Sequence, residues 1–237
     1  PNGATISFTS TGALPTGLSV GTVYFVVNST GGTFNVATTI NGIPITTSGG
    51  QSGIQRISQR GINLADVSDD DCPIYQNYLL VSDTSRFILV FGTNDYSSTV
   101  LNPMLIRWSS QEDPYTWTPS ITNQAGSIQL SHGSEIITAI QTRQEIVVFT
   151  DTALYSMQYV GPPFVWSSQL LGDNISVAGP NAVALASGVI YWMGVDKFYM
   201  YDGRVQTLNC DLRRYVFQDF NTLQSQQVYA GTSEGFN

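Results

Sequence analysis

Short hydrophobic runs separated by turn-forming residues dominate this chain. The runs are rich in β-branched and aromatic residues, and they recur about every eight to twelve residues along most of the sequence. This spacing is typical of β-sandwiches, β-barrels and β-propellers, in which antiparallel strands follow one another through short turns. The sequence therefore predicts an all-β fold.

The first part of the chain, residues 1–53, predicts a separate small β-domain that is inserted or appended as a module. It is almost free of charge and predicts about five strands, the clearest at residues 5–8, 22–27, 33–38 and 43–46. Asn41-Gly42 is a favoured hairpin turn, and Pro44 places the last run at a sheet edge or a bulge. The sequence SGGQSG at residues 48–53 predicts a flexible exit linker.

The remainder, residues 54–237, predicts a larger body of antiparallel meanders. The expected strands are residues 78–81, 87–91, 104–108, 136–141, 145–150, 153–159, 182–186, 189–193, 198–201 and 205–208.

An internal similarity favours a β-propeller-like body over a sandwich. Residues 146–157 align with residues 190–201 at an offset of about 45 residues, the length of one four-stranded propeller blade. In each copy a strand of large apolar residues leads through an Asp-containing turn to an aromatic strand. The alignment predicts equivalent strands in successive blades, and it predicts four buried side chains on one strand face: Val147, Phe149, Tyr191 and Met193.

One short helix is expected near the C-terminus, from Asp211 to about Phe220. Leu212, Val216 and Phe220 would share one apolar face, and the carboxylate of Asp211 suits the positive end of the helix dipole.

Charge is scarce and acidic. Only 11% of the residues are charged, the formal net charge is −8, and Lys197 is the one lysine. Such a low charge count indicates that part of the surface is buried against other subunits. Tight nucleic-acid binding needs clustered cations, so this composition argues against a protein that grips DNA, whereas an acidic wall would let a duplex slide.

The sequence predicts no enzyme, no cofactor and no metal site. His132 is the only histidine and lies in a polar turn, and no G-x-S-x-G or nucleotide-binding fingerprint is present. The glutamates that could serve glycosidase chemistry are Glu112, Glu135, Glu145 and Glu234.

The remaining polar candidates have structural interpretations. The acidic run at residues 69–71, with Asp66 nearby, lacks the alternation and the glycine of a calcium loop, so a solvated acidic turn is expected. Cys72 and Cys210 are expected to be reduced and buried. The longest apolar run, residues 182–193, is too short to span a bilayer, and no signal peptide is visible.

Residues 110–117 resemble a degenerate Asp-box, the S-x-D-x-G-x-T-W hairpin of sialidase-like propellers. Glu112 stands in place of the Asp and Pro114 in place of the Gly. The resemblance implies a folding element away from any active site. The nearby aromatics Trp108, Tyr115 and Trp117 are expected to pack in a core or an interface, although they could also stack on sugars.

Three stretches resemble tailed-phage virion proteins. Residues 106–119 (IRWSSQEDPYTWTP) look like the WS…DP..W.P segment of these proteins, and residues 126–208 are similar to the tail hub, nozzle or packaged-DNA-stabilisation proteins, especially those of short-tailed phages. Residues 13–39 resemble a small β-module that recurs across phage structural proteins.

The resemblance implies a homo-oligomeric ring, commonly a hexamer, that lies below the portal and adaptor. Such a ring extends the DNA channel, retains the packaged double-stranded genome without binding it tightly, and docks tail fibre or needle proteins. The implied location is the virion, assembled in the host cytoplasm without stable membrane insertion. The chain is shorter than a whole nozzle protein and stops at Asn237, where the pattern predicts the start of another strand, so we expect an incomplete propeller from a longer polypeptide.

Two alternative functions remain compatible with the sequence. A receptor- or glycan-binding tail module would bind sugars on a glycan array. A sialidase-like glycoside hydrolase would turn over a fluorogenic sialoside and lose that activity when an Asp or Glu is replaced.

Overall fold

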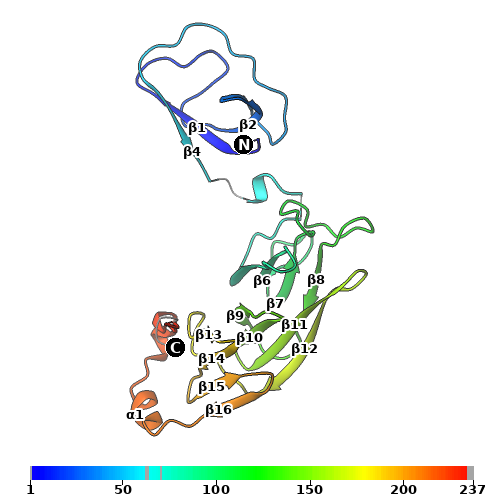
Figure 1. Cartoon of the computed structure of the whole chain (residues 1–237), viewed down its shortest axis with the longest axis vertical. Coiled ribbons are helices and arrows are strands. Elements are labelled where there is room, and N and C mark those ends of the chain that lie inside the picture. Colours follow the sequence, from blue (N-terminus) through cyan, green and yellow to red (C-terminus); the bar gives the residue numbers. More distant parts are fainter. Residues whose placement is uncertain (1, 62–63, 70, 234–237) are drawn as a thin grey trace. The chain divides into compact units, whose positions relative to one another are not determined.

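The computed structural model describes residues 2–61, 64–69 and 71–233 (Figure 1). In this described part the chain forms four four-stranded antiparallel sheets, one short α-helix and two 3-10 segments, which confirms the all-β prediction. Contacts divide the chain into two compact units, Pro1–Val67 and Ser68–Asn237.

The first unit contains one sheet, with the strand order β3-β2-β1-β4. Its strands are β1 (Thr5–Ser10), β2 (Val23–Thr30), β3 (Thr33–Ala37) and β4 (Gln55–Gln59). A small apolar core covers one face of this sheet and contains Ile6, Tyr24, Val26 and Val36.

Two expectations for this unit are not met. Residues 43–46 form no strand, and only the Ile45 backbone N donates to a strand, at 2.8 Å from the Val36 carbonyl. Pro44 has no N–H to donate, which works against a strand there. The expected linker at residues 48–53 is instead held within the unit, because the Ala13 backbone N donates to Ser52 Oγ at 2.9 Å.

The change in composition near Gly53 predicted a domain boundary there, but strand β4 lies after that point. It pairs antiparallel with β1, and Ile6 lies opposite Gln59. Because sheet pairing depends on backbone hydrogen bonds and not on composition, the first unit continues past Gly53, to Val67.

The second unit contains three consecutive meanders, which we call the first, second and third body sheets. The first is β5 (Tyr78–Val81), β6 (Ile88–Asn94), β7 (Leu101–Trp108) and β8 (Gly126–Gln129). The second is β9 (Ile136–Gln141), β10 (Ile146–Thr150), β11 (Ala153–Gly161) and β12 (Val165–Asp173). The third is β13 (Val183–Ala186), β14 (Val189–Met193), β15 (Phe198–Tyr201) and β16 (Val205–Leu208).

The two aligned sequence copies occupy equivalent strands. Ile146 lies opposite Met157 in the second body sheet, and Ile190 lies opposite Tyr201 in the third, which fixes the offset at 44 residues (190 − 146 and 201 − 157). The predicted equivalence of residues 146–157 and 190–201 is therefore confirmed in strand order and in register.

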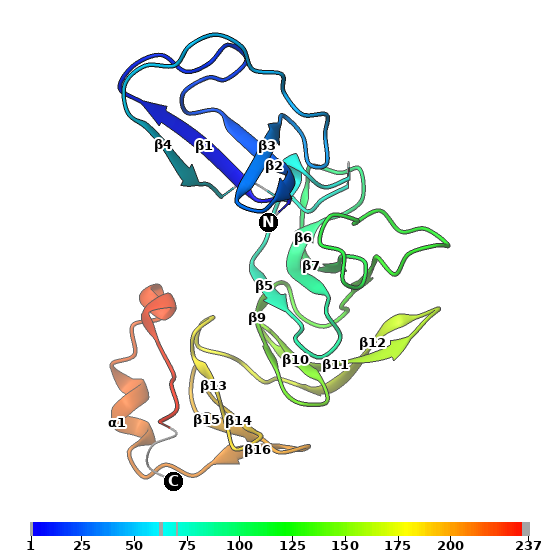
Figure 2. The ribbon, with the colours of Figure 1, turned by 45° about the horizontal axis from the view of Figure 1, so that its top comes forward.

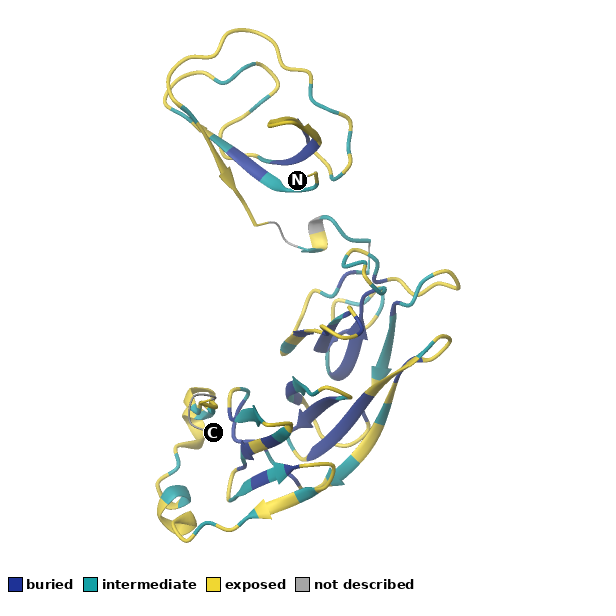
Figure 3. Ribbon diagram, viewed as in Figure 1, coloured by how far each residue is buried: buried dark blue, intermediate teal, exposed yellow. Residues whose placement is uncertain are grey.

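Two apolar cores hold the three body sheets face to face. Successive residues of β10 point into opposite cores: Val148 faces the first body sheet, whereas Val147 and Phe149 face the third. Figure 3 shows the buried residues concentrated on these stacked strands. Strand β9 also contacts β5 and β6, so these two sheets approach each other at their first strands, an arrangement visible in Figure 2. Meander sheets stacked in this way form a propeller-like body.

The burial prediction is right for one copy and wrong for the other. Val147 and Phe149 are buried, but Tyr191 is 37% exposed and Met193 is half-buried. The second body sheet has a sheet packed on each face, whereas within the described residues no sheet covers the face of β14 that carries Tyr191.

The C-terminal helix is shorter than predicted. Helix α1 (Arg213–Gln218) begins after Leu212, which caps it and is exposed, so the predicted apolar face is wrong at that residue. Phe217 packs on Phe198 with ring centroids 5.2 Å apart, and this contact joins the helix to the third body sheet. A 3-10 segment, η2 (Thr222–Gln227), follows. In the described part of the chain no helix has the length and apolarity to cross a membrane.

A matched pair of phenylalanines tests this core. Phe149 is 1% exposed between the second and third body sheets, whereas Phe164, in the β11–β12 turn, is 77% exposed. Phe149→Ala is expected to lower the free energy of unfolding by about 3–5 kcal/mol because it leaves a cavity, and Phe164→Ala by no more than about 0.5 kcal/mol. Urea unfolding of both variants measures the difference, and equal losses would contradict the stacked-sheet core.

Candidate functional surfaces

His132 does not belong to a nucleophile–base–acid arrangement. Its Nδ1 lies 3.0 Å from Ser131 Oγ and 3.1 Å from the Tyr155 hydroxyl, and its backbone N donates to the same hydroxyl at 2.8 Å. Among the described residues no carboxylate hydrogen-bonds to this imidazole. The histidine thus helps to anchor the loop ahead of β9 to β11.

Two of the four candidate glutamates, Glu112 and Glu145, interact with other side chains. Glu112 pairs with Arg86 at 2.5 Å. Glu145, in the β9–β10 turn, accepts hydrogen bonds from the Ser156 and Tyr201 hydroxyls, the latter at 2.9 Å. Glu234 lies outside the described residues.

The most developed polar cluster surrounds Glu145. It borders a pocket of about 610 Å³ between turns of the second and third body sheets, which Asp202 and Arg143 also line. Both carboxylates are engaged, because the Asp202 oxygens accept from Gln206 Nε2 at 3.2 and 3.1 Å. The Glu145–Tyr201 hydrogen bond ties the second and third body sheets together. The sequence analysis named Glu145 but missed its partner Tyr201.

Burial, followed by the hydrogen bond and the charge of Glu145, raises the pKa of Tyr201 to about 12. All three effects disfavour the phenolate.

Two members of the acidic run, Asp69 and Asp71, are anchored by hydrogen bonds, whereas the sequence predicted a solvated turn. Asp69 Oδ2 accepts hydrogen bonds from the backbone N atoms of Trp117 and Thr118, at 2.8 and 2.7 Å. Asp71 Oδ1 accepts from the Ser97 backbone N at 2.7 Å. Asp70 and the side chain of Asp66 lie outside the described part. Among the described residues no three His, Cys, Asp or Glu side chains gather as a metal-binding group.

The Asp-box-like segment lies in the long loop between β7 and β8 and closes on itself. The Ser110 backbone N donates to the Thr116 carbonyl at 2.8 Å, and Asp113 accepts from the Tyr115 backbone N and the Thr116 hydroxyl. Trp117 is fully buried beneath the loop. Trp108 is buried as well, so Tyr115 is the only one of the three singled-out aromatics exposed enough to stack on a ligand.

A fully buried arginine, which sequence reasoning missed, closes one end of the body. Arg107 on β7 donates to the Asn94 carbonyl at 3.2 Å and to the Asp71 carbonyl, and its guanidinium lies 4.2 Å from the centroid of the Tyr96 ring. These contacts hold the segment that begins at Asp71 and the β6–β7 turn on the outer side of the first body sheet.

Both cysteines are free thiols. Cys72 is buried as expected, and burial raises the pKa of its thiol. Cys210 is only half-buried.

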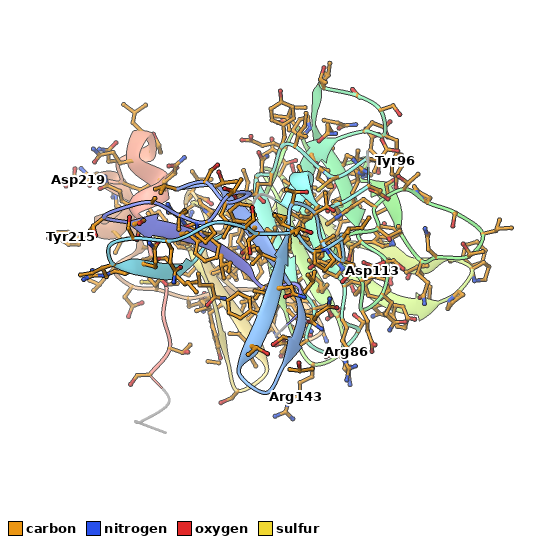
Figure 4. All side chains as sticks on the ribbon, turned by 90° about the horizontal axis from the view of Figure 1, so that it is seen from above. Arg86, Tyr96, Asp113, Arg143, Tyr215 and Asp219 are labelled. Atoms are coloured by element: carbon orange, nitrogen blue, oxygen red, sulfur yellow. The ribbon has the colours of Figure 1, made fainter. Side chains whose placement is uncertain are left out.

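Three of the nine cations are already paired or buried. Arg86 is paired with Glu112, Arg107 is buried, and Arg213 of α1 is paired with Asp196 in the β14–β15 turn at 3.0 Å. Figure 4 shows Arg143 projecting from the molecule, well apart from Tyr215 and Asp219 of the C-terminal segment.

The outer face of the third body sheet carries a groove of about 450 Å³. Tyr191, Met193, Phe198 and Leu208 line it from the sheet, and residues 228–232 form one wall. The Ala230 backbone N donates to the Asn181 carbonyl at 2.8 Å, which holds this wall beside β13.

No family model matches the chain, and no curated protein matches it. Its function is therefore inferred from its residues and its fold.

The raised pKa of Tyr201 predicts a loss of stability at high pH. An unfolded tyrosine ionises near pH 10, while the folded phenol keeps its proton to about pH 12, so the folded state binds more protons in this window and stability falls as pH rises. The stability due to this group is expected to be present below pH 10 and to be lost progressively between about pH 10 and pH 12. Urea unfolding at pH 9 and pH 11 should show it in the native chain and not in Tyr201→Phe; an equal pH dependence in both proteins would contradict it.

Proposed function

We propose that this chain is a structural component of a tailed-phage virion, from the tail hub or nozzle. It would form a ring that extends the DNA channel, retains the packaged genome and docks neighbouring tail proteins. The main support for the proposal is that the segment resembling these phage proteins is also the segment that forms the repeated sheets. Residues 126–208, which resemble this family, run from β8 through β16 and contain two complete body sheets with one shared register.

The architecture suits a mechanical role. The second body sheet is buried on both faces, and side chains of its neighbours tie it in place at the turns, as Glu145 and Tyr201 do. Sheets packed at protein-interior density resist deformation, since any shear between them opens voids. A stiff wall of this kind is what a channel under internal pressure needs.

The chemistry of the described residues also favours a structural role over an enzyme. His132 contacts Ser131 and Tyr155 instead of a carboxylate, and Glu145 and Asp202 are both engaged in hydrogen bonds. The proposal accordingly assigns no catalytic residue.

Particle fractionation tests the proposed function. Tailed particles from the source of this sequence would be banded in a density gradient, analysed by mass spectrometry and labelled with antibodies raised against the purified chain. Peptides of the chain are expected in the particle band, with label at the tail. Peptides confined to the particle-free fractions would overturn the proposal.

The charge distribution predicts no tight binding of free duplex DNA. Affinity for DNA grows with each phosphate that a clustered cation neutralises, with a salt slope of about 0.9 per contact. Here nine basic residues face 17 acidic ones, and three of the nine are paired or buried. Titration of labelled duplex at about 50 and 200 mM salt should give no submicromolar binding. Submicromolar binding that weakens steeply with salt would reveal a basic surface and contradict the sliding channel.

A further inference from the structure

A cavity of about 250 Å³ lies between the first and second body sheets, where the β5–β6 turn meets the β9–β10 turn. Thr84 lines it from the first turn and Gln144 from the second, with Gln141 at the end of β9 beside them. Gln141 Nε2 donates to Thr84 Oγ1 at 3.3 Å, so the two turns are joined at the edge of the cavity. Both sheets share one apolar core, and this packing fixes the shape of the cavity.

Aromatic rings form one wall of the cavity. Tyr159 of β11 and Trp166 of β12 line it, and Phe87 contacts both, with its ring centroid 5.6 Å from that of Tyr159 and 5.7 Å from that of Trp166. Phe87 and Trp166 are buried, whereas Tyr159 is 38% exposed. The wall therefore leaves part of the Tyr159 ring open to a ligand and holds that ring against two buried aromatic neighbours.

A chain of hydrogen bonds fixes the polar side of the same cavity. The Tyr159 hydroxyl donates to Gln124 Oε1 at 3.2 Å, and Gln124 Nε2 donates to Gln111 Oε1 at 3.0 Å. Gln111 Nε2 in turn donates to the Ser85 carbonyl at 3.0 Å. Gln111 and Ser85 both line the cavity, so polar groups around it are positioned before a ligand arrives. Groups that are already ordered lose little conformational freedom on binding.

Two side chains of the β9–β10 turn are free to bind a ligand. Arg143 and Gln144 are exposed, and among the described residues Arg143 makes no ion pair and the Gln144 side-chain amide makes no hydrogen bond. The charged residues that line the cavity are Arg143 and Glu145, whose formal charges cancel. A site without net charge gives no electrostatic preference for a phosphate or another anion.

We propose that this cavity binds a sugar residue of a neutral glycan. Each sugar hydroxyl both donates and accepts hydrogen bonds, as the amides and hydroxyls around the cavity do. The C–H face of a sugar ring is apolar and packs on an aromatic ring such as that of Tyr159. A partly apolar wall with a few fixed polar groups is the usual form of a small-ligand site. The sequence left a glycan-binding role open without a site, and this cavity supplies one.

The ligand can extend beyond one sugar. The β9–β10 turn also lines the 610 Å³ pocket between the second and third body sheets, and Arg143 and Gln144 border both cavities. A glycan chain can therefore continue from the first cavity across this turn into the second. We accordingly expect oligosaccharides to bind more tightly than the monosaccharides that they contain, because they contact both cavities.

A glycan array and matched tyrosine variants test the inference. Tyr159→Ala removes the open part of the aromatic wall. Tyr191→Ala is the control, because Tyr191 is 37% exposed on β14 and lines neither cavity. Gln144→Ala removes an exposed amide and leaves the aromatic packing intact, so it keeps the test decisive if loss of the Tyr159 ring destabilises the fold. The array carries neutral mono- and oligosaccharides together with sialylated and sulfated glycans, and urea unfolding shows which variants fold.

Neutral oligosaccharides are expected to bind the native chain and Tyr191→Ala equally. Calorimetric titration with the strongest binder should show affinity weakened by about 10-fold or more in Tyr159→Ala, and by about 3- to 10-fold in Gln144→Ala, which loses one hydrogen bond. Absence of glycan binding, binding of sialylated or sulfated glycans alone, or binding that neither variant weakens would each overturn the inference. The array uses the purified chain and does not depend on its place in a virion, so this inference and the proposed function can fail separately.

Discussion

The fold of the larger unit depends on the burial of both faces of each internal sheet. An antiparallel sheet usually leaves one face to water, but β10 buries Val147, Val148 and Phe149 in succession. A strand that is apolar on both faces is stable only between two other sheets. The constraint passes along the stack from sheet to sheet, so the sheets at the two ends must meet loops, other segments or other chains.

The two ends meet this constraint differently. At the first body sheet the end face is polar in part: Arg107 is buried, donates to two backbone carbonyls, lies against an aromatic ring, and holds a loop over part of the face. Repeat proteins commonly place a polar cap of this kind at a terminal repeat. At the third body sheet the face stays apolar, and it is bordered by residues 228–232 and contacted by Phe217 of the C-terminal helix through Phe198. The two ends of the stack are therefore chemically different.

Local pattern was enough to predict most of the strands, because alternation and turn residues act over a few residues. The alignment of residues 146–157 with 190–201 went further and placed two hairpins in successive sheets with the correct register. Features that depend on distant partners were out of reach. Strand β4 joins the first unit because it pairs with β1. Tyr191 is exposed because, within the described residues, no sheet packs on its face of β14. The Glu145–Tyr201 hydrogen bond joins residues 56 positions apart. The anchoring of Asp69 was missed for the same reason, since the backbone N atoms that donate to its carboxylate lie in a loop 48 and 49 residues away.

The central claim is that the second body sheet is packed between the first and the third. Its most direct test uses the chain's own methionines: Met157 is fully buried in the core between the first and second body sheets, whereas Met200 on β15 is half-buried. Oxidation by brief hydroxyl-radical exposure, read by mass spectrometry, would be compared between the folded chain and the chain unfolded in urea. The account predicts that Met157 is protected in the folded chain and oxidises on unfolding, while Met200 oxidises in both states. Oxidation of Met157 in the folded chain at the rate of the unfolded chain would contradict it.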